Sequence, residues 1–104
     1  MKTTELKTID ITTLVWFDKT YGNSYFAQEI TLNYGLSNAE VYKNPFQYGY
    51  DSYQYEAIDF LAKNVFPEFK ESKIHDFFKF CDENKIVIRS NTYRNCKKRE
   101  LINI

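Results

Sequence analysis

The stretch Trp16–Phe26 reads WFDKTYGNSYF and has an aromatic pair on each side of a polar turn. Gly22 and Asn23 tolerate a positive φ at low cost, as the turn of a hairpin requires. Residues 6–17 and 24–33, on either side, alternate apolar and polar side chains in the period of two that is typical of strands. The sequence therefore predicts a β-hairpin with its tip between these two segments.

The first of these strands carries apolar residues along the whole of one face, whereas its second face becomes apolar only at Leu14 and Trp16. Apolar side chains on both faces of a strand indicate that both faces are covered. We therefore expect the sheet to be covered on both sides near the hairpin tip.

Residues 39–43 predict a short third strand. Pro45 indicates either an edge strand or a break at this point, because proline cannot donate a hydrogen bond to a sheet. Residues 46–55 then read FQYGYDSYQY, which predicts a loop that leads into a helix, with Asp51 or Ser52 as its N-cap.

Two amphipathic helices follow, because apolar side chains recur at the spacing of one helix face. We expect the first to end at Pro67 and the second to cover residues 72–84. Residues 86–88 begin a fourth strand. Residues 89–101 either continue this strand along the sheet edge or turn at Arg94-Asn95 and return as a fifth strand.

The order βββ-αα-β(β) predicts an α+β fold. We expect an antiparallel sheet of four to five strands with both helices packed on one face. A chain of 104 residues has the size of one domain, so residues 1–104 are assigned to a single domain.

The chain has no net charge, with 14 basic and 14 acidic residues, but the charges are unevenly distributed. Residues 86–104 hold five basic residues and one acidic residue, which allows a local basic patch on a neutral protein. No apolar run approaches the roughly 18 residues of a membrane span, and the first residues do not form a signal peptide. We expect a cytoplasmic protein without a membrane partner.

No motif in the sequence predicts a catalytic, metal or cofactor site. His75 is the only histidine, and its sequence neighbour Asp76 would not face it on a helix. Asp51, Glu56 and Asp59 could hold Mg²⁺ or transfer protons, although a helix cap beside a solvated acidic face is the commoner outcome of such a pattern. The two cysteines fit neither a disulfide framework nor a Cys-x-x-Cys metal site. We therefore expect a protein that is not an enzyme.

Basic and hydrogen-bonding residues alternate through the C-terminal segment. Such a row can follow a phosphate backbone, with a tyrosine as a stacking platform. The candidate nucleic-acid-binding residues are Arg89, Tyr93, Arg94, Lys97, Lys98 and Arg99. An edge strand also carries Lys and Arg to prevent aggregation, and the sequence alone favours this second interpretation.

Four tyrosines surround Gly49 in the segment before the first helix. Some of them must close the core, and the others could anchor a protein partner, because tyrosine is frequent among the residues that dominate binding energy. The candidates for partner contact are Tyr48, Tyr50 and Tyr53.

The segments Trp16–Asp18, Gly22–Phe26 and Pro45–Tyr50 together resemble a family of small phage-encoded proteins of unassigned function. The resemblance covers residues 9–60. It implies an accessory phage protein in the cytoplasm of the host cell, a class whose members bind host proteins and include anti-CRISPR proteins.

This resemblance leads to the hypothesis of a stoichiometric inhibitor of a host defence complex, such as an RNA-guided nuclease or its guide RNA. The alternative is a nucleic-acid-binding module that binds RNA through the basic segment. A small metal-dependent nuclease and a phage structural component are further alternatives. An exposed strand edge could also pair two copies of the chain into a homodimer.

Overall fold

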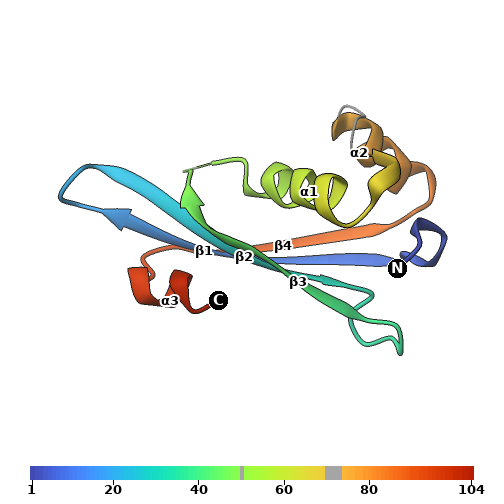
Figure 1. Ribbon diagram of the computed structural model, residues 1–104, viewed down its shortest axis with the longest axis horizontal. Helices are drawn as coiled ribbons and strands as arrows, with labels where there is room; N and C mark the ends of the chain where they lie inside the picture. Colours follow the sequence, from blue (N-terminus) through green and yellow to red (C-terminus); the bar gives the residue numbers. More distant parts are fainter. Residues whose placement is uncertain (50, 70–73) are drawn as a thin grey trace.

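The computed structural model describes residues 1–49, 51–69 and 74–104 of the chain. Four strands form one sheet in the order β3-β2-β1-β4 (Figure 1). The strands are β1 (Thr8–Asp18), β2 (Asn23–Leu32), β3 (Glu40–Tyr48) and β4 (Val87–Tyr93). The helices are α1 (Tyr53–Asn64), α2 (Ile74–Glu83) and α3 (Lys98–Ile102), with short 3₁₀ helices at Thr3–Glu5 and Pro67–Phe69. The predicted α+β fold is confirmed.

The predicted hairpin is formed by β1 and β2. The two strands pair in antiparallel fashion from Ile9 opposite Leu32 to Asp18 opposite Asn23. Gly22 closes the turn with a φ of 70°, and its N–H donates to the carbonyl oxygen of Asp18 at 2.7 Å. Gly22 therefore adopts the positive φ that the sequence predicted for the turn, whereas Asn23 is the first residue of β2 and does not.

The third strand is longer than predicted, because β3 continues through Pro45 to Tyr48. Its register against β2 shifts between Phe26 and Gln28, so β3 contains one residue more than its partner there. Proline is tolerated on an edge strand and at such a bulge, where a ladder donor is not required. Tyr48 consequently lies in a strand, opposite Tyr25, and not in a loop.

The sheet is mixed and not antiparallel throughout, because β4 pairs with β1 in parallel. The connection through α1 and α2 carries the chain back over the sheet, so β4 enters in the same direction as β1. The expected continuation into a longer or fifth strand is also wrong. Asn95 has a φ of 63° and turns the chain, and α3 follows.

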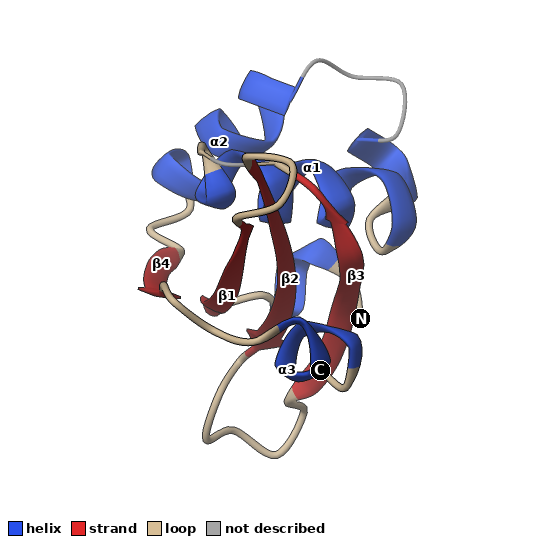
Figure 2. Ribbon diagram, turned by 90° about the vertical axis from the view of Figure 1, so that its left-hand side faces the viewer, coloured by secondary structure: helices blue, strands red, loops and turns tan. Residues whose placement is uncertain are grey.

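Helices cover both faces of the sheet. Figure 2 shows α1 and α2 on one side and α3 on the other. The sequence predicted two helices on one face of the sheet, and α1 and α2 confirm this prediction. The prediction of cover on both faces near Leu14 and Trp16 is also confirmed, since α3 contacts β1, β2 and β3. No helix of the described residues is long and apolar enough to cross a membrane.

The main core lies between the sheet and helices α1 and α2. Its members are apolar side chains from every layer, and the largest fully buried ones include Ile9, Ile11, Ile30, Leu32, Ile58, Leu61, Phe66 and Phe77. The helix stripes predicted from the 3.6-residue period thus face the sheet, as amphipathic helices do.

A second, smaller cluster joins the hairpin to the start of α1. Val15, Phe26 and Tyr53 are all buried there. Gly49 lies against the Phe26 ring so closely that a Cβ atom would sit 2.6 Å from its Cε1 atom. A side chain does not fit at this position, which explains why glycine stands between the surrounding tyrosines.

A buried polar network lies beside this cluster. Gln28 is fully buried, and its Nε2 atom donates to Thr13 Oγ1 at 3.1 Å and to the Tyr53 carbonyl oxygen at 2.7 Å. Its Oε1 atom accepts from Asn44 Nδ2 at 2.8 Å, and Asn44 in turn accepts from Gln47 at 2.7 Å. One side chain thereby links β1, β2, β3 and the first residue of α1.

Replacing Gln28 by methionine should destabilise the protein by about 2–4 kcal/mol, because buried groups of Thr13, Asn44 and Tyr53 would lose their hydrogen-bond partner. Urea unfolding followed by circular dichroism measures this change. The control is Glu29→Gln, which removes an exposed ion pair with Lys43 and should cost about 0–1 kcal/mol. Equal effects of the two substitutions would contradict the role assigned to the network.

Candidate functional site

Aromatic side chains form a continuous row on the sheet face that carries α3. Trp16 on β1 stacks on Tyr25 of β2, with 5.4 Å between ring centroids and 28° between ring planes. Tyr25 stacks in turn on Phe46 of β3, at 5.2 Å and 8°. Tyr48 meets Tyr25 edge-on at 5.9 Å. The row arises because the strand register places these residues next to one another on one face.

Helix α3 is fixed beside this row. Leu101 is fully buried, and the N–H of Cys96 donates to the carbonyl oxygen of Val15 at 3.0 Å. The Lys98 ammonium is thereby held 5.6 Å from the centroid of the Trp16 ring and 6.0 Å from that of Phe46. Both distances are within the range of a cation–π interaction.

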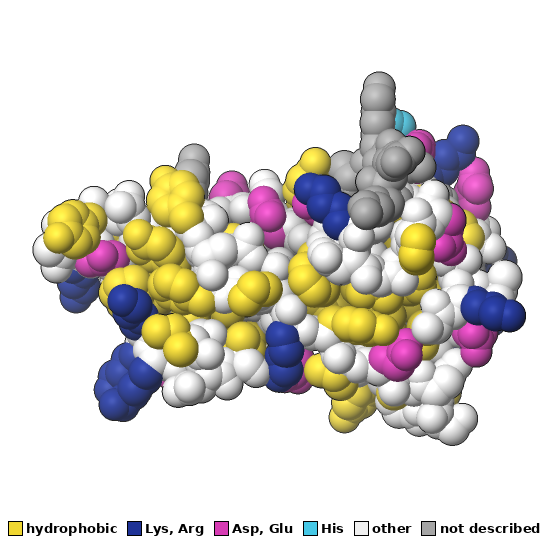
Figure 3. All heavy atoms as spheres, viewed as in Figure 1, with side chains coloured by type: hydrophobic (Ala, Val, Ile, Leu, Met, Phe, Trp, Pro, Cys, Tyr) yellow, Lys and Arg dark blue, Asp and Glu magenta, His cyan; other side chains and the backbone are white. Residues whose placement is uncertain are grey.

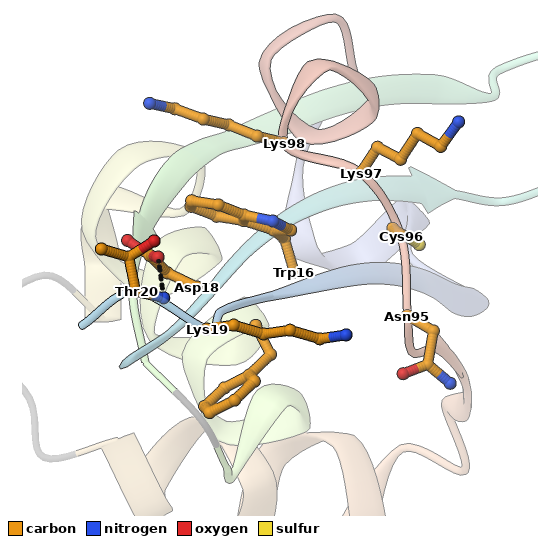
Figure 4. A pocket seen from close by; sticks show the side chains of 9 residues that line it. Trp16, Asp18, Lys19, Thr20, Asn95, Cys96, Lys97 and Lys98 are labelled. Atoms are coloured by element: carbon orange, nitrogen blue, oxygen red, sulfur yellow. Dashed lines mark hydrogen bonds between the residues drawn. The ribbon is translucent and has the colours of Figure 1, made fainter. Parts of the chain in front are cut away.

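A groove of about 450 Å³ opens next to Trp16. One wall is Trp16–Thr20 at the end of β1, and the other is Asn95–Lys98 at the start of α3 (Figure 4). Three lysines line it, namely Lys19, Lys97 and Lys98, together with a single carboxylate.

The carboxylate is that of Asp18, and it stabilises the hairpin turn by accepting from the Thr20 N–H at 2.9 Å. The groove therefore combines the indole of Trp16 with an excess of positive charge. Figure 3 shows Lys and Arg side chains beside hydrophobic ones at the end of the molecule that holds α3.

The basic residues predicted to bind nucleic acid are not brought together. Arg89 pairs with Asp10 in a two-pronged contact, with 2.6 Å between Nε and Oδ1 and 2.9 Å between Nη2 and Oδ2. Hydrogen bonding to Asp10 raises the pKa of Arg89. The Arg94 guanidinium lies 5.8 Å from the centroid of the Tyr53 ring. Only Lys97 and Lys98 of the predicted set line the groove.

The remaining members of that set lie outside the groove. Arg99 is exposed on α3, and Tyr93 is exposed at the end of β4. The segment is divided in this way because the chain turns at Asn95 and leaves the sheet edge. The expected single row of cations along an extended strand is therefore wrong.

The three tyrosines predicted to contact a partner differ in their surroundings. Tyr48 is 63% exposed, but Tyr53 is 6% exposed and packs on Phe26 at 5.1 Å between centroids. Burial raises the pKa of Tyr53, and the neighbouring Arg94 offsets part of that rise. Tyr53 thus belongs to the core and does not offer its ring to a partner. Tyr50 lies outside the residues that the structure describes.

The acidic residues near the start of α1 have structural partners. Asp51 Oδ1 accepts from the Ser52 N–H at 2.7 Å, and Asp59 pairs with Lys63 at 2.8 Å. Ser52, one of the two predicted N-cap residues, is the N-cap of α1, but its side chain makes no capping hydrogen bond. Among residues 1–49, 51–69 and 74–104, no three His, Cys, Asp or Glu residues are grouped so that they could hold a metal ion.

Sequence reasoning missed Lys19, Trp16 and Phe46 as members of one site. A signal was present for Trp16, because it lies on the face of the hairpin that was expected to be covered, opposite Tyr25. The contribution of Phe46 depends on the bulge in β3, and no sequence feature gave its position.

We found no match to this chain among protein-family models, curated proteins or solved structures. The resemblance to small phage proteins therefore remains a prediction, and the function must be argued from the site.

The groove can be monitored by its cysteine. Cys96 lines the groove, whereas Cys81 is buried and its burial raises the thiol pKa to about 12. Thiolate is the reactive form, so the Cys81 thiol should not react with Ellman's reagent near neutral pH. We expect one rapidly reacting thiol per folded chain and two in denaturant. The Cys96→Ser variant should show no rapid reaction when folded, and a rapid reaction there would contradict this arrangement.

Proposed function

We propose that this protein is a non-enzymatic binding module for single-stranded nucleic acid, with RNA as the expected ligand. The observation that carries the proposal is the placement of three lysines around Trp16 in one groove. Cations that neutralise phosphates, combined with an aromatic ring on which a base can stack, are the elements of single-strand recognition.

The geometry supports each part of this assignment. Tyr25 stacks on Trp16 and holds the indole in the groove, where a base would stack on the ring in place of the Lys98 ammonium that lies 5.6 Å from its centroid. Lys97, the residue before α3, and Lys98 on α3 supply cations on one wall, and Lys19 on the turn supplies one on the other. The groove volume lies within the range of roughly 300–1,000 Å³ that is usual for small-ligand sites.

The test is binding of a short fluorescent single-stranded RNA at several salt concentrations. Trp16 is the only tryptophan, so its fluorescence gives a second readout from the groove itself. The double substitution Lys97→Ala with Lys98→Ala should weaken binding roughly 10- to 30-fold at about 0.1 M salt and reduce the slope of log K against log salt by about 1.4, if each lysine contacts one phosphate.

The matched control is Lys63→Ala with Lys79→Ala. It removes the same charge from exposed positions on α1 and α2, far from the groove in sequence and on the other side of the sheet. We expect the control to bind RNA with the parent slope. Absence of binding, or equal losses in the two double variants, would refute the proposed site.

A second candidate function is the inhibition of a host defence complex by direct contact. It is favoured by three exposed aromatic side chains at the same end of the sheet: Phe17 is 50% exposed, Tyr21 78% and Tyr48 63%. Exposed aromatic rings are frequent anchors of protein interfaces. The inhibitor would act stoichiometrically, by covering a surface that the defence complex needs.

Affinity purification of the tagged protein from host cells, with and without ribonuclease, separates the two candidates. An inhibitor should retain a host protein in a one-to-one ratio after ribonuclease and lose it when Phe17, Tyr21 and Tyr48 are replaced by alanine. The control, Tyr34→Ala with Leu36→Ala, removes exposed apolar side chains from the turn between β2 and β3. Recovery that requires intact RNA would instead support the nucleic-acid-binding module.

A further inference from the structure

The free edge of β4 is the least protected part of the sheet. Six of the seven residues of β4 are exposed, and no strand of the described residues pairs with its outer side. The opposite edge, β3, contains Pro45 and a bulge, which are features that prevent pairing with another chain. β4 has neither feature, and its one charged residue, Arg89, is engaged by Asp10.

The backbone groups on this edge can be assigned. The N–H of Val87 donates to the carbonyl oxygen of Lys7, which precedes β1, so the backbone groups of Val87 point toward β1. Successive residues of a strand direct their backbone groups to alternate sides. Ile88, Ser90 and Thr92 therefore present their N–H and C=O groups outward.

We propose that β4 pairs with β4 of a second copy of this chain, antiparallel and centred on Ser90. In this register Ser90 lies opposite Ser90 of the second copy, and Ile88 lies opposite its Thr92. Each of these three residues then lies opposite an outward-facing residue of the second copy, and the two exchange backbone N–H···O=C hydrogen bonds. A register shifted by two residues would leave part of this set without an opposite partner within the strand.

The side chains fit the same register. Val87 and Tyr93, which are 50% and 56% exposed, become direct neighbours across the two-fold axis. A β-branched residue opposite an aromatic one is a favourable cross-strand pair. Arg89 lies opposite Asn91, so no like charges meet.

The resulting interface is isologous, because the same strand contributes from both copies. It would extend the sheet to the order β3-β2-β1-β4-β4-β1-β2-β3, with the axis perpendicular to the sheet. The α3 faces of both copies would point to the same side. Helix α2 lies toward the Val87 end of β4 (Figure 1), so the α2 helices of the two copies would be at opposite ends of the interface.

Sedimentation velocity between about 5 µM and 0.5 mM tests the pairing, since a small interface of this kind is expected to be weak. The unmodified protein should show a concentration-dependent dimer. Ser90→Pro removes an outward N–H that β1 does not use, and it should leave the circular dichroism of the monomer unchanged while abolishing the dimer. Ser90→Ala keeps the N–H and should dimerise like the parent. A monomer throughout the range, or a dimer that survives Ser90→Pro, would overturn the proposal.

A charge-exchange pair tests the register without changing the backbone. Val87→Lys with Tyr93→Lys places cations opposite each other at both ends of the interface and should weaken dimerisation roughly tenfold or more. Val87→Lys with Tyr93→Glu places opposite charges there and should restore dimerisation to within about threefold of the parent. Equal dimerisation of the two variants would overturn the register centred on Ser90. Neither variant alters the lysine-lined groove, so the outcome is independent of the proposed function.

Discussion

The side chain of Gln28 is the constraint on which the arrangement of the sheet depends. It is buried between the sheet and α1, where an unpaired amide would be costly, and it finds partners on β1, β3 and α1. Holding Asn44 opposite Gln28 fixes where the extra residue of β3 must fall. In a regular register Phe46 would lie opposite Phe26 and face the core. With the bulge it lies on the other face, beside Tyr25. A polar network on the core side of the sheet thus determines the aromatic row on the opposite face.

The two faces of the sheet are consequently covered in different ways. The face below α1 and α2 holds the apolar core, which supplies the burial that stabilises a domain of this size. The face below α3 is closed only near the hairpin tip, where Leu101 is buried. This short helix contributes no ring to the aromatic row, but its first residue, Lys98, and the preceding Lys97 line the groove beside Trp16. The groove therefore exists only because segments from the two ends of the chain meet beside Trp16.

Much of the fold could be predicted because it follows local periodicity. The hairpin, the two long helices and the cover on both faces near Leu14 and Trp16 were all visible in the sequence.

The errors in the predicted fold occur where long-range packing overrides a local rule. Pro45 does not end β3, since an edge strand with a bulge tolerates it. The parallel entry of β4 depends on the path of the two helices, and α3 is a five-residue helix with one buried apolar side chain, which leaves no periodic signal. For the groove, the sequence singled out Lys97 and Lys98 but not the aromatic row beside which they lie.

The number of basic residues in the C-terminal segment overstates the number of cations that are available to bind an anion. Arg89 is neutralised by Asp10 across the parallel pair of strands, and Arg94 is turned toward the ring of Tyr53 on the other side of the fold. Each of these cations has a structural partner that a phosphate would have to replace. Among the lysines of the groove, Lys98 lies beside an aromatic ring, where its ammonium can also meet an anion. A nucleic acid in this groove would then be held by about three phosphate contacts and by stacking, which favours a short single strand over a long duplex.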